Sequence, residues 1–216
     1  MAFVAVIDYG MGNLHSIAKA LQHSSSNDET IVITGDPKSI LSADKVVFPG
    51  VGAMRDCMQA LIQAGLVEVI NHVALTKPLL GICLGMQALM TTSAEAPDTE
   101  CLNIFSGQVL RFSDHLHDNA GNTLKIPHMG WNHVEQTPHP LWQNIPQNSR
   151  FYFVHSYYVQ PNDNCFIAGT ANYPHSFPCA IARNNIFAVQ FHPEKSQTVG
   201  LQLLKNFLSW DGTVAF

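Results

Sequence analysis

Cys83 stands between two glycines, in a pattern that can turn a cysteine into a nucleophile. The apolar residues from Pro78 to Ile82 predict a buried strand, and a helix is expected directly after the cysteine. In the stretch Gly81-Ile82-Cys83-Leu84-Gly85, the two glycines leave room for neighbouring backbone at a strained strand-to-helix turn. The free N–H groups at the start of a helix favour negative charge nearby. We therefore interpret Cys83 as an attacking thiolate beside part of an oxyanion hole.

A second stretch, near the C-terminus, supplies the partners that such a cysteine needs. Phe187–Glu194 predicts a strand that delivers His192, followed two residues later by Glu194. Side chains at i and i+2 of a strand share a face. With Cys83 as nucleophile, His192 as base and Glu194 as the group that orients the base, the three would form a catalytic triad. The alternative is a structural role, which is the more common one for a single cysteine or histidine.

The chemistry that fits this triad is amide hydrolysis through a thioester. Cys83 would attack the carbonyl carbon of an amide, and the oxyanion would be held by the N–H of Leu84 and by one from the turn with Val51 and Gly52. His192 would take the thiol proton and return it to the leaving amine, and water would then release the acid from the thioester. Glu194 would hold the imidazole in the required tautomer.

The same residues resemble those of a known family, the class I glutamine amidotransferases, whose nucleophile elbow and His-x-Glu ending match Gly81–Gly85 and His192–Glu194. Within the family, the chain looks most like the glutaminase subunits of imidazole glycerol phosphate synthases. The stretches that carry this narrower resemblance are Ile7–Leu14, Pro49–Gly52, Pro127–Asn132, Tyr152–Tyr157 and His192–Ser196. Anthranilate-type and GMP-synthase-type members share the triad but not the Asp-Tyr-Gly-Met-Gly-Asn and Pro-His-Met-Gly-Trp-Asn runs.

The resemblance also implies a substrate, binding residues and a partner. The amide would be the side-chain carboxamide of glutamine, which would be hydrolysed to glutamate and ammonia. The positions that match the glutamine pocket are Gly50, Gly52, Gln87, Glu95, His155 and Ser156. Of these, Glu95 is suited to the substrate ammonium. The ammonia would pass to a separate cyclase subunit in a heterodimer, which would make imidazole glycerol phosphate and aminoimidazole carboxamide ribonucleotide in histidine biosynthesis. We expect Lys195, Trp131 and Tyr152 at the partner interface, although the two aromatic residues also fit a core. No cofactor and no metal ion are expected.

Three other functions remain open at this stage. The chain could be the glutaminase subunit of an anthranilate or aminodeoxychorismate synthase, and copurification with a chorismate enzyme would show it. It could be a stand-alone cysteine hydrolase of the same fold, for which glutamine would be no better than other amides. It could be a non-catalytic regulatory subunit, which an intact Cys83, His192 and Glu194 disfavours.

Length and composition set bounds on the class of protein. The 216 residues predict a single glutamine amidotransferase domain over residues 1–216. The net charge of −5 and the lack of lysine or arginine clusters argue against a nucleic-acid partner. Five cysteines without a C-x-x-C spacing fit reduced thiols, and no apolar run reaches the ~18 residues of a membrane span. We expect a soluble, cytoplasmic protein without a membrane partner. His115 and His117, which have aspartates beside them, fit a polar loop better than a metal site.

The elements that must position these residues follow from hydrophobic periodicity. Apolar strands are predicted at Phe3–Asp8, Glu29–Thr34 and Lys45–Phe48, with a fourth before Cys83, and helices at Leu14–Leu21 and Met54–Ala64. This alternation predicts an α/β fold with a doubly wound, mostly parallel central sheet and helices on both faces. In such sheets the site lies at the carboxyl ends of the strands.

The C-terminal half changes to short alternating runs, which we interpret as antiparallel additions to the sheet. These runs are Asn103–Phe112, Thr123–Ile126 and Arg150–Gln160. Cys179–Arg183 and Ile186–Phe191 predict a hairpin that turns at Asn184 and Asn185 and sends its last strand towards His192. A final helix is predicted over Gln197–Trp210.

Overall fold

The framework of the molecule is a large mixed sheet that confirms the predicted α/β class. The structure, a computed structural model, describes residues 2–26, 29–117 and 121–213. Within these residues the largest sheet has eight strands, in the order β2-β1-β3-β4-β13-β12-β11-β8. The strands are β1 (Ala2–Ile7), β2 (Glu29–Thr34), β3 (Lys45–Gly50), β4 (Leu79–Cys83), β8 (Glu135–Gln136), β11 (Ile167–Asn172), β12 (Ser176–Arg183) and β13 (Ile186–Val189). Neighbours from β2 to β13 are parallel, and those from β13 to β8 are antiparallel.

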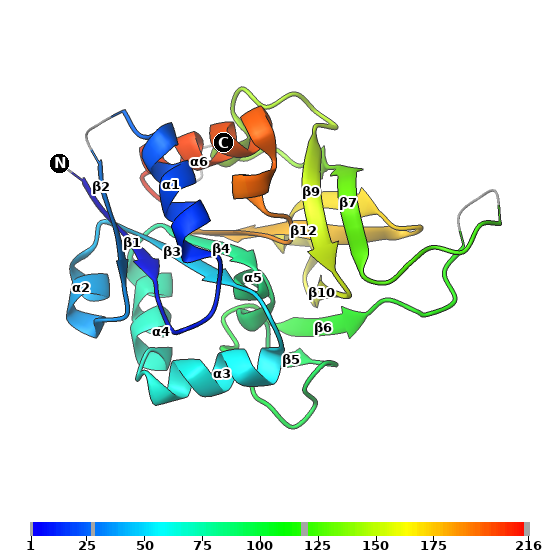
Figure 1. Cartoon of the computed structure of the whole chain (residues 1–216), viewed down its shortest axis with the longest axis horizontal. Coiled ribbons are helices and arrows are strands. Elements are labelled where there is room, and N and C mark those ends of the chain that lie inside the picture. The colour runs from blue at the N-terminus through cyan, green and yellow to red at the C-terminus, as the bar shows by residue number, and fades with distance from the viewer. Residues whose placement is uncertain (1, 27–28, 118–120, 214–216) are drawn as a thin grey trace.

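Helices cover both faces of this sheet (Figure 1). On one face lie α1 (Leu14–Ser24) and α6 (Gln197–Ser209). On the other lie α2 (Pro37–Ser42), α3 (Met54–Gln63), α4 (Val67–Thr76) and α5 (Leu84–Ala88). The apolar stripe predicted for the first helix is its buried face, because Leu14, Ile17, Ala18 and Leu21 all lie in the core. The predicted α/β layering therefore follows from these stripes packing on the sheet.

No single helix of the described chain is long and apolar enough to cross a membrane. Helices α3 and α4 meet that requirement only together, and they are bent by 93° at the break between them. Each buries four residues: Met54, Cys57, Met58 and Leu61 in α3, and Val69, Ile70, Val73 and Ala74 in α4.

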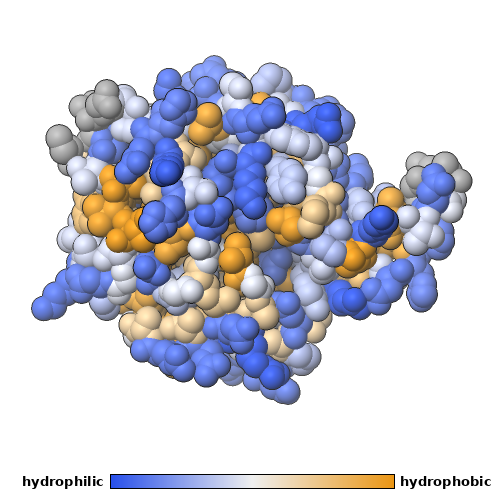
Figure 2. Space-filling model, in the orientation of Figure 1, coloured by the Kyte–Doolittle hydropathy of each residue, from blue (hydrophilic) through white to orange (hydrophobic). Residues whose placement is uncertain are grey.

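The core consists of two apolar clusters, one on each face of the sheet. Successive residues of β1 alternate between them, so that Val4 and Val6 belong to one cluster and Ala5 and Ile7 to the other. A strand that is buried on both faces must be apolar throughout, which is why the parallel strands are continuous apolar runs in the sequence. Outside the core the surface is largely hydrophilic, with apolar patches that include one over β1 and β2 (Figure 2).

The predicted hairpin near the C-terminus is confirmed, and it decides where the last strand lies. β12 and β13 pair antiparallel around Asn184, whose φ of 52° suits a tight turn. β13 then pairs in parallel with β4, with Val189 opposite Ile82. The residues after β13 therefore emerge beside the end of β4, where Cys83 lies.

Two predictions for the middle of the chain are wrong. The expected strand Thr123–Ile126 is not formed, since only Thr123 makes an isolated bridge, with His117. Leu124 and Ile126 are partly buried against the core, so their apolar alternation comes from a loop that packs on the core. The expected strand Arg150–Gln160 is two strands, β9 (Arg150–His155) and β10 (Tyr157–Pro161). The chain breaks at Ser156 because β9 pairs with β7 (His128–His133), whereas β10 pairs with β6 (Gly107–Arg111).

The remaining elements are short. β5 (Thr92–Ser93) pairs in parallel with β6, so this part of the C-terminal half is not purely antiparallel. The described residues also form three 3₁₀ turns: η1 (Pro140–Trp142), η2 (Asn164–Phe166) and η3 (Pro193–Lys195). The β7–β9 pair lies beyond the ends of the parallel strands in Figure 1, on the side where those strands finish.

Candidate active site

Cys83 ends β4 in a backbone conformation that an L-residue rarely adopts, with φ 55° and ψ −111°. The neighbouring glycines are required by space. A Cβ on Gly85 would lie 2.0 Å from the carbonyl oxygen of Phe48, and one on Gly81 would lie 2.9 Å from the Cβ of Ala188. Helix α5, which follows, has five residues, so the free N–H groups of its first turn matter more than a helix dipole. The turn has the geometry of a nucleophile elbow.

His192 and Glu194 form a buried pair next to this elbow. Nδ1 of His192 lies 2.8 Å from Oε1 of Glu194, and their side chains are only 4% and 1% exposed. Because an ionised carboxylate can only accept, Nδ1 carries the proton and donates it to Glu194. Nε2 of His192 is then the atom available to a substrate or a thiol, and it is buried without a hydrogen bond to any described residue. Cys83 lies beside this ring, with no hydrogen bond between Nε2 and its sulfur.

The pair does not arise from the pleat of a strand, as the sequence had led us to expect. β13 ends at Val189, and Glu194 lies in η3, which Pro193 begins. The 3₁₀ turn brings the carboxylate of Glu194 back onto the ring of His192, two residues earlier in the chain. Ser196 fixes this turn, because its hydroxyl donates to the carbonyl of His192 at 2.6 Å and accepts from the N–H of Tyr152 at 3.0 Å.

The environment of His192 favours its charged form. Burial alone lowers the pKa of the ring, but Cys83 and Glu194 beside it outweigh burial and raise the pKa to about 10. An imidazolium next to a thiol favours the thiolate over the thiol. The electrostatics thus suit a Cys–His pair that is ready for nucleophilic attack.

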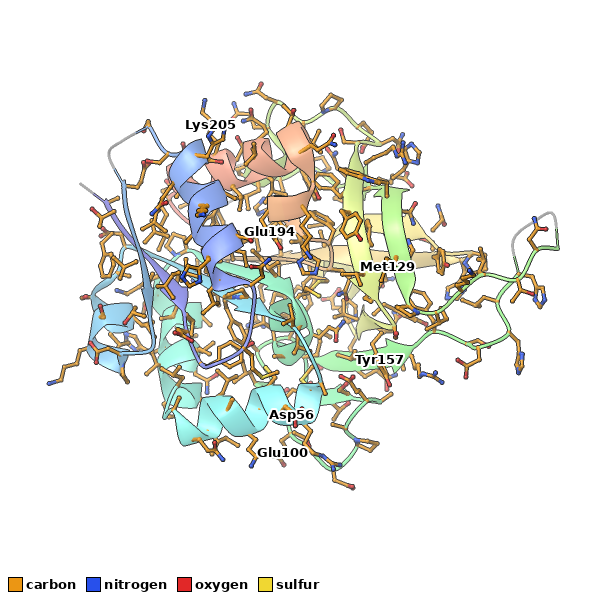
Figure 3. The ribbon with its side chains drawn as sticks, in the orientation of Figure 1. Asp56, Glu100, Met129, Tyr157, Glu194 and Lys205 are labelled. Atoms are coloured by element: carbon orange, nitrogen blue, oxygen red, sulfur yellow. The ribbon has the colours of Figure 1, made fainter. Side chains whose placement is uncertain are left out.

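A cavity of about 280 Å³ joins the elbow to most of the other predicted site residues. Its lining residues are Val51, Gly52, Cys83, Leu84, Gln87, Glu95, Pro127, Val154, His155, Ser156, Tyr157 and His192. Gly50, predicted to contact the substrate, is not on the wall. It lies in β3 opposite Cys83, where a Cβ would come 2.6 Å from the hydroxyl of Tyr9. Figure 3 labels Glu194 and Tyr157, which come from η3 and from the start of β10.

Glu95 places a carboxylate on the wall of this cavity. Its Oε2 accepts a hydrogen bond of 2.9 Å from the N–H of Met54, the first residue of α3. A carboxylate is stable at the start of a helix, where N–H groups lack partners. Glu95 is therefore held in place and presents negative charge to the cavity.

His155, a predicted pocket residue, is hydrogen-bonded to a second histidine, His128, for which the sequence predicted no role. His155 lines the cavity, and its Nε2 lies 2.9 Å from Nδ1 of His128. Burial lowers the pKa of His155 to about 3 and that of His128 to about 4, so both rings are neutral. The motif that contains His128 was visible in the sequence, but its contact with His155 depends on the register of β7 against β9.

The three residues expected at a partner interface lie together on the outer side of β7 and β9. Trp131 is paired across the strands with Tyr152, with ring centroids 6.0 Å apart. Nζ of Lys195 lies 5.9 Å from the centre of the Tyr152 ring. Trp131 is 37% exposed, whereas Phe153, on the inner side, is fully buried. Trp131 is thus a surface residue and not a core residue, a choice that the sequence had left open.

No group of three His, Cys, Asp or Glu side chains within the described ranges could hold a metal ion. His115 and His117 belong to those ranges, but Asp118 lies outside the described residues.

Comparison with known proteins identifies relatives of the chain over almost its whole length. The model of the family "Glutamine amidotransferase class-I" matches residues 5–210. The chain is 58% identical over 213 residues to the protein "Imidazole glycerol phosphate synthase subunit HisH" of Methylococcus capsulatus, covering 98% of each chain. It is 55% identical to the protein of the same name from Acinetobacter baylyi, covering 98% of this chain and all of the relative.

Solved structures share the fold at much lower sequence identity. A crystal structure of a glutamine amidotransferase matches with a TM-score of 0.71 and 16% identity, covering 97% of this chain and 99% of that one. A putative GMP synthase protein from Thermoplasma acidophilum matches with a TM-score of 0.68 and 20% identity, covering 97% and 93%. These likenesses concern the fold alone.

Proposed function

The chain belongs to the class I glutamine amidotransferases, and we propose that Cys83, His192 and Glu194 form the catalytic triad of its glutaminase site. The chain hydrolyses glutamine to glutamate and ammonia, and the ammonia serves the synthesis of imidazole glycerol phosphate in histidine biosynthesis. The observation that carries the residue assignment is the cavity lined by a strained Cys83 and by His192, whose ring is hydrogen-bonded to the buried Glu194.

The reaction follows from the positions of the three side chains. Cys83 attacks the carboxamide carbon of glutamine, and a C–S bond forms as the electron pair of the carbonyl moves to oxygen. His192 gives a proton to the amine, the C–N bond breaks, and ammonia leaves a thioester. Water then attacks the thioester, with His192 accepting its proton, and the C–S bond breaks to release glutamate. Glu194 keeps Nδ1 of His192 protonated through the 2.8 Å hydrogen bond.

The cavity wall supplies the groups that a glutamine zwitterion requires. The N–H of Leu84 and one from the turn with Val51 and Gly52 serve as the oxyanion hole. The carboxylate of Glu95 binds the substrate ammonium. Gln87, His155 and Ser156 line the rest of the glutamine pocket. Gly50 lies just before the turn and leaves room for the hydroxyl of Tyr9.

The partner in this proposal is a cyclase subunit. The relatives are named as subunits of a synthase, so the chain works with a partner protein. We assign the docking surface to Trp131, Tyr152 and Lys195 because the exposed Trp131 and Lys195 flank the half-buried ring of Tyr152 beside the triad turn. In this view residues 1–216 act as one glutamine amidotransferase domain in a heterodimer, in the cytoplasm, without nucleic acid, membrane or cofactor.

The division of labour is tested with Cys83→Ala. The variant should lose synthesis that depends on glutamine but keep synthesis from added ammonia in the complex, because the acceptor chemistry lies on the cyclase. Cys165→Ala, which removes the exposed thiol outside the cavity, is the control and should retain both activities. If Cys83→Ala binds the cyclase but fails with ammonia as well, the proposal is wrong. If it still uses glutamine, Cys83 is not the nucleophile.

A further inference from the structure

The side chain of Gln190 contacts the sulfur of Cys83, and the reaction described above assigns it no role. Nε2 of Gln190 lies 3.7 Å from Sγ of Cys83, within the range of hydrogen bonds to sulfur. Gln190 is fully buried between the end of β13 and His192, so its amide needs partners inside the protein. Its backbone N–H donates to the carbonyl of Cys179 at 2.9 Å, which fixes the main chain at this residue.

Hydrogen bonding decides which end of the Gln190 amide faces the sulfur. Gln87 donates through Nε2 to the carbonyl oxygen of Tyr157 at 3.1 Å, and that oxygen can only accept. The same nitrogen lies 2.9 Å from Oε1 of Gln190. Turning the Gln190 amide around would bring two NH₂ groups together and aim a carbonyl oxygen at the sulfur. The NH₂ group of Gln190 therefore faces Cys83.

The acceptor that anchors this chain is itself fixed. The carbonyl of Tyr157 also accepts from Nδ1 of His155 at 2.7 Å, so it holds two donors in place. Gln87 lies in α5, directly after the elbow, whereas Gln190 lies just before His192. The chain of hydrogen bonds consequently ties the nucleophile segment to the segment that carries the base.

A dry environment makes the contact with sulfur effective. Cys83 is 8% exposed and Gln87 4%, so little water competes for the sulfur or for the amide. In such surroundings an N–H donor stabilises a negative charge more than a neutral thiol. The donor acts twice in a thioester reaction: on the attacking thiolate, and on the sulfur when the C–S bond breaks and the electron pair returns to it.

We propose that Gln190 is a further catalytic residue, which donates a hydrogen bond to the Cys83 thiolate, and that Gln87 is the positioning residue for its amide. This inference rests on the proposed glutaminase reaction. It adds a hydrogen-bond donor to the thiolate that comes from the segment with His192 and not from α5, the helix after Cys83.

The test measures the thiolate directly and needs no glutamine. In a Cys165→Ala background, the rate of Cys83 alkylation by iodoacetamide is followed from pH 5 to pH 10, with mass spectrometry to assign the site. Gln190→Met keeps the length of the side chain and removes the donor. A hydrogen bond to a charged group is commonly worth a factor of about 10 to 100, so alkylation near neutral pH should slow by at least about 10-fold and recover at high pH.

Two further variants keep the result interpretable. Gln87→Met leaves Gln190 in place without its support and should slow alkylation in the same direction by a smaller factor. Gln147→Met removes an exposed amide bonded to Gln136, far from the cavity, and should match the wild type. Circular dichroism checks that each variant is folded, and if Gln190→Met does not fold, the Gln87→Met result decides.

The outcome separates this inference from the glutaminase proposal. If the alkylation profile of folded Gln190→Met, or failing that of Gln87→Met, equals that of the wild type, Gln190 is not a thiolate donor. Loss of glutaminase turnover with an unchanged alkylation profile overturns the donor role in the same way. If the wild type alkylates at Cys83 but releases no ammonia from glutamine even with the cyclase and its nucleotide, the glutaminase proposal fails while the donor role stands.

Discussion

His128 donates a hydrogen bond of 2.9 Å from its Nδ1 to Nε2 of His155. The direction is fixed because Nδ1 of His155 must donate to the carbonyl of Tyr157, at 2.7 Å, which leaves Nε2 of the neutral ring as an acceptor. Nε2 of His128 can then accept from the amide of Asn132, which lies 3.3 Å away. The inner side of β7 thus supports the wall of the cavity at Cys83, while its outer side carries Trp131 and the exposed Met129, labelled in Figure 3.

The first prediction removes the donor of this pair. His128→Phe keeps a ring against Tyr173 and Phe153 but leaves the buried Nε2 of His155 without a partner. We expect the KM for glutamine to rise and the free energy of unfolding to fall by about 1–3 kcal/mol. Steady-state kinetics and urea denaturation measure the two effects. His133→Phe, on the exposed side of the same strand, is the control, and an unchanged KM in His128→Phe would remove His128 from the site.

The second prediction concerns stability at acidic pH. Burial lowers the pKa of His128 and His139 to about 4 and that of His155 to about 3, from an ordinary value of 6.5. Below pH 6.5 the unfolded chain therefore binds protons that the folded chain does not, so stability must fall as the pH falls from 6.5 towards 4. Each histidine contributes a slope of about 1.4 kcal/mol per pH unit in this window.

Urea denaturation at several pH values between 7 and 4.5 measures this slope. His139→Phe keeps the ring contacts with Phe187 and Trp210 and removes one of the titrating groups, so its slope should be shallower than that of the wild type. A stability that is constant over this range would contradict the prediction.

The third prediction concerns the turn with Val51 and Gly52, to which we assign one of the oxyanion donors. The hydroxyl of Tyr9 donates to the carbonyl of Pro49 at 2.9 Å in a buried setting, just before Val51 and Gly52. Tyr9→Phe removes only that hydroxyl, and we expect kcat for glutamine hydrolysis in the complex to fall with little change in KM. Tyr158→Phe, a ring of the C-terminal half that also packs on the core, is the matched control. Equal kcat values in the two variants would show that the turn does not depend on Tyr9.

The fourth prediction tests the residue that orients the base. Glu194→Gln should keep the fold and reduce glutamine-dependent turnover by ~10²–10⁴, because the amide no longer stabilises the charged ring of His192. The pKa of His192 should fall in this variant, since Glu194 is one of the two groups that raise it. Two-dimensional NMR of the ring protons follows the titration. Near-full activity would reduce Glu194 to a structural role.

The last prediction is that the isolated chain is a poor glutaminase and that an acceptor-loaded cyclase activates it. Gly50 and Gly52 allow the intervening peptides to point either an N–H or a carbonyl at the thioester site, and Gly52 has a φ of 96°. One oxyanion donor is commonly worth ~10²–10³ in rate. A partner can shift this equilibrium only if it binds one orientation better than the other.

The measurement compares ammonia release by the chain alone, with the cyclase, and with the cyclase plus its nucleotide. We expect a strong rise only in the third case, and equal turnover in all three would exclude the gating idea. Lys195→Ala should weaken the activation, because Lys195 follows the triad carboxylate on the proposed docking surface. Lys205→Ala, an exposed lysine of α6 labelled in Figure 3, should leave activation unchanged.

Some features of the fold could be predicted because they depend only on residues that are close in the sequence. The apolar runs of β1 to β4 and the stripe of α1 follow from strand and helix periodicity. Helices α2 and α4 were not singled out: α2 is short and has a single buried residue, and α4 is apolar with little periodicity. The strand expected at Thr123–Ile126 failed because alternation also occurs in loops that pack on a core.

By itself the sequence determined the chemistry that is encoded locally: a cysteine between two glycines, a His-x-Glu segment, and the strands and helices on either side. Only the tertiary structure decided that β13 lies beside β4, which brings Gln190 to Cys83 across 107 residues of chain and places His192 next to it. The register of β7 against β9 likewise decided that His128 meets His155. Strand order and register depend on packing between segments that are distant in the sequence. The hydrophobic pattern within one strand does not specify which strand it pairs with.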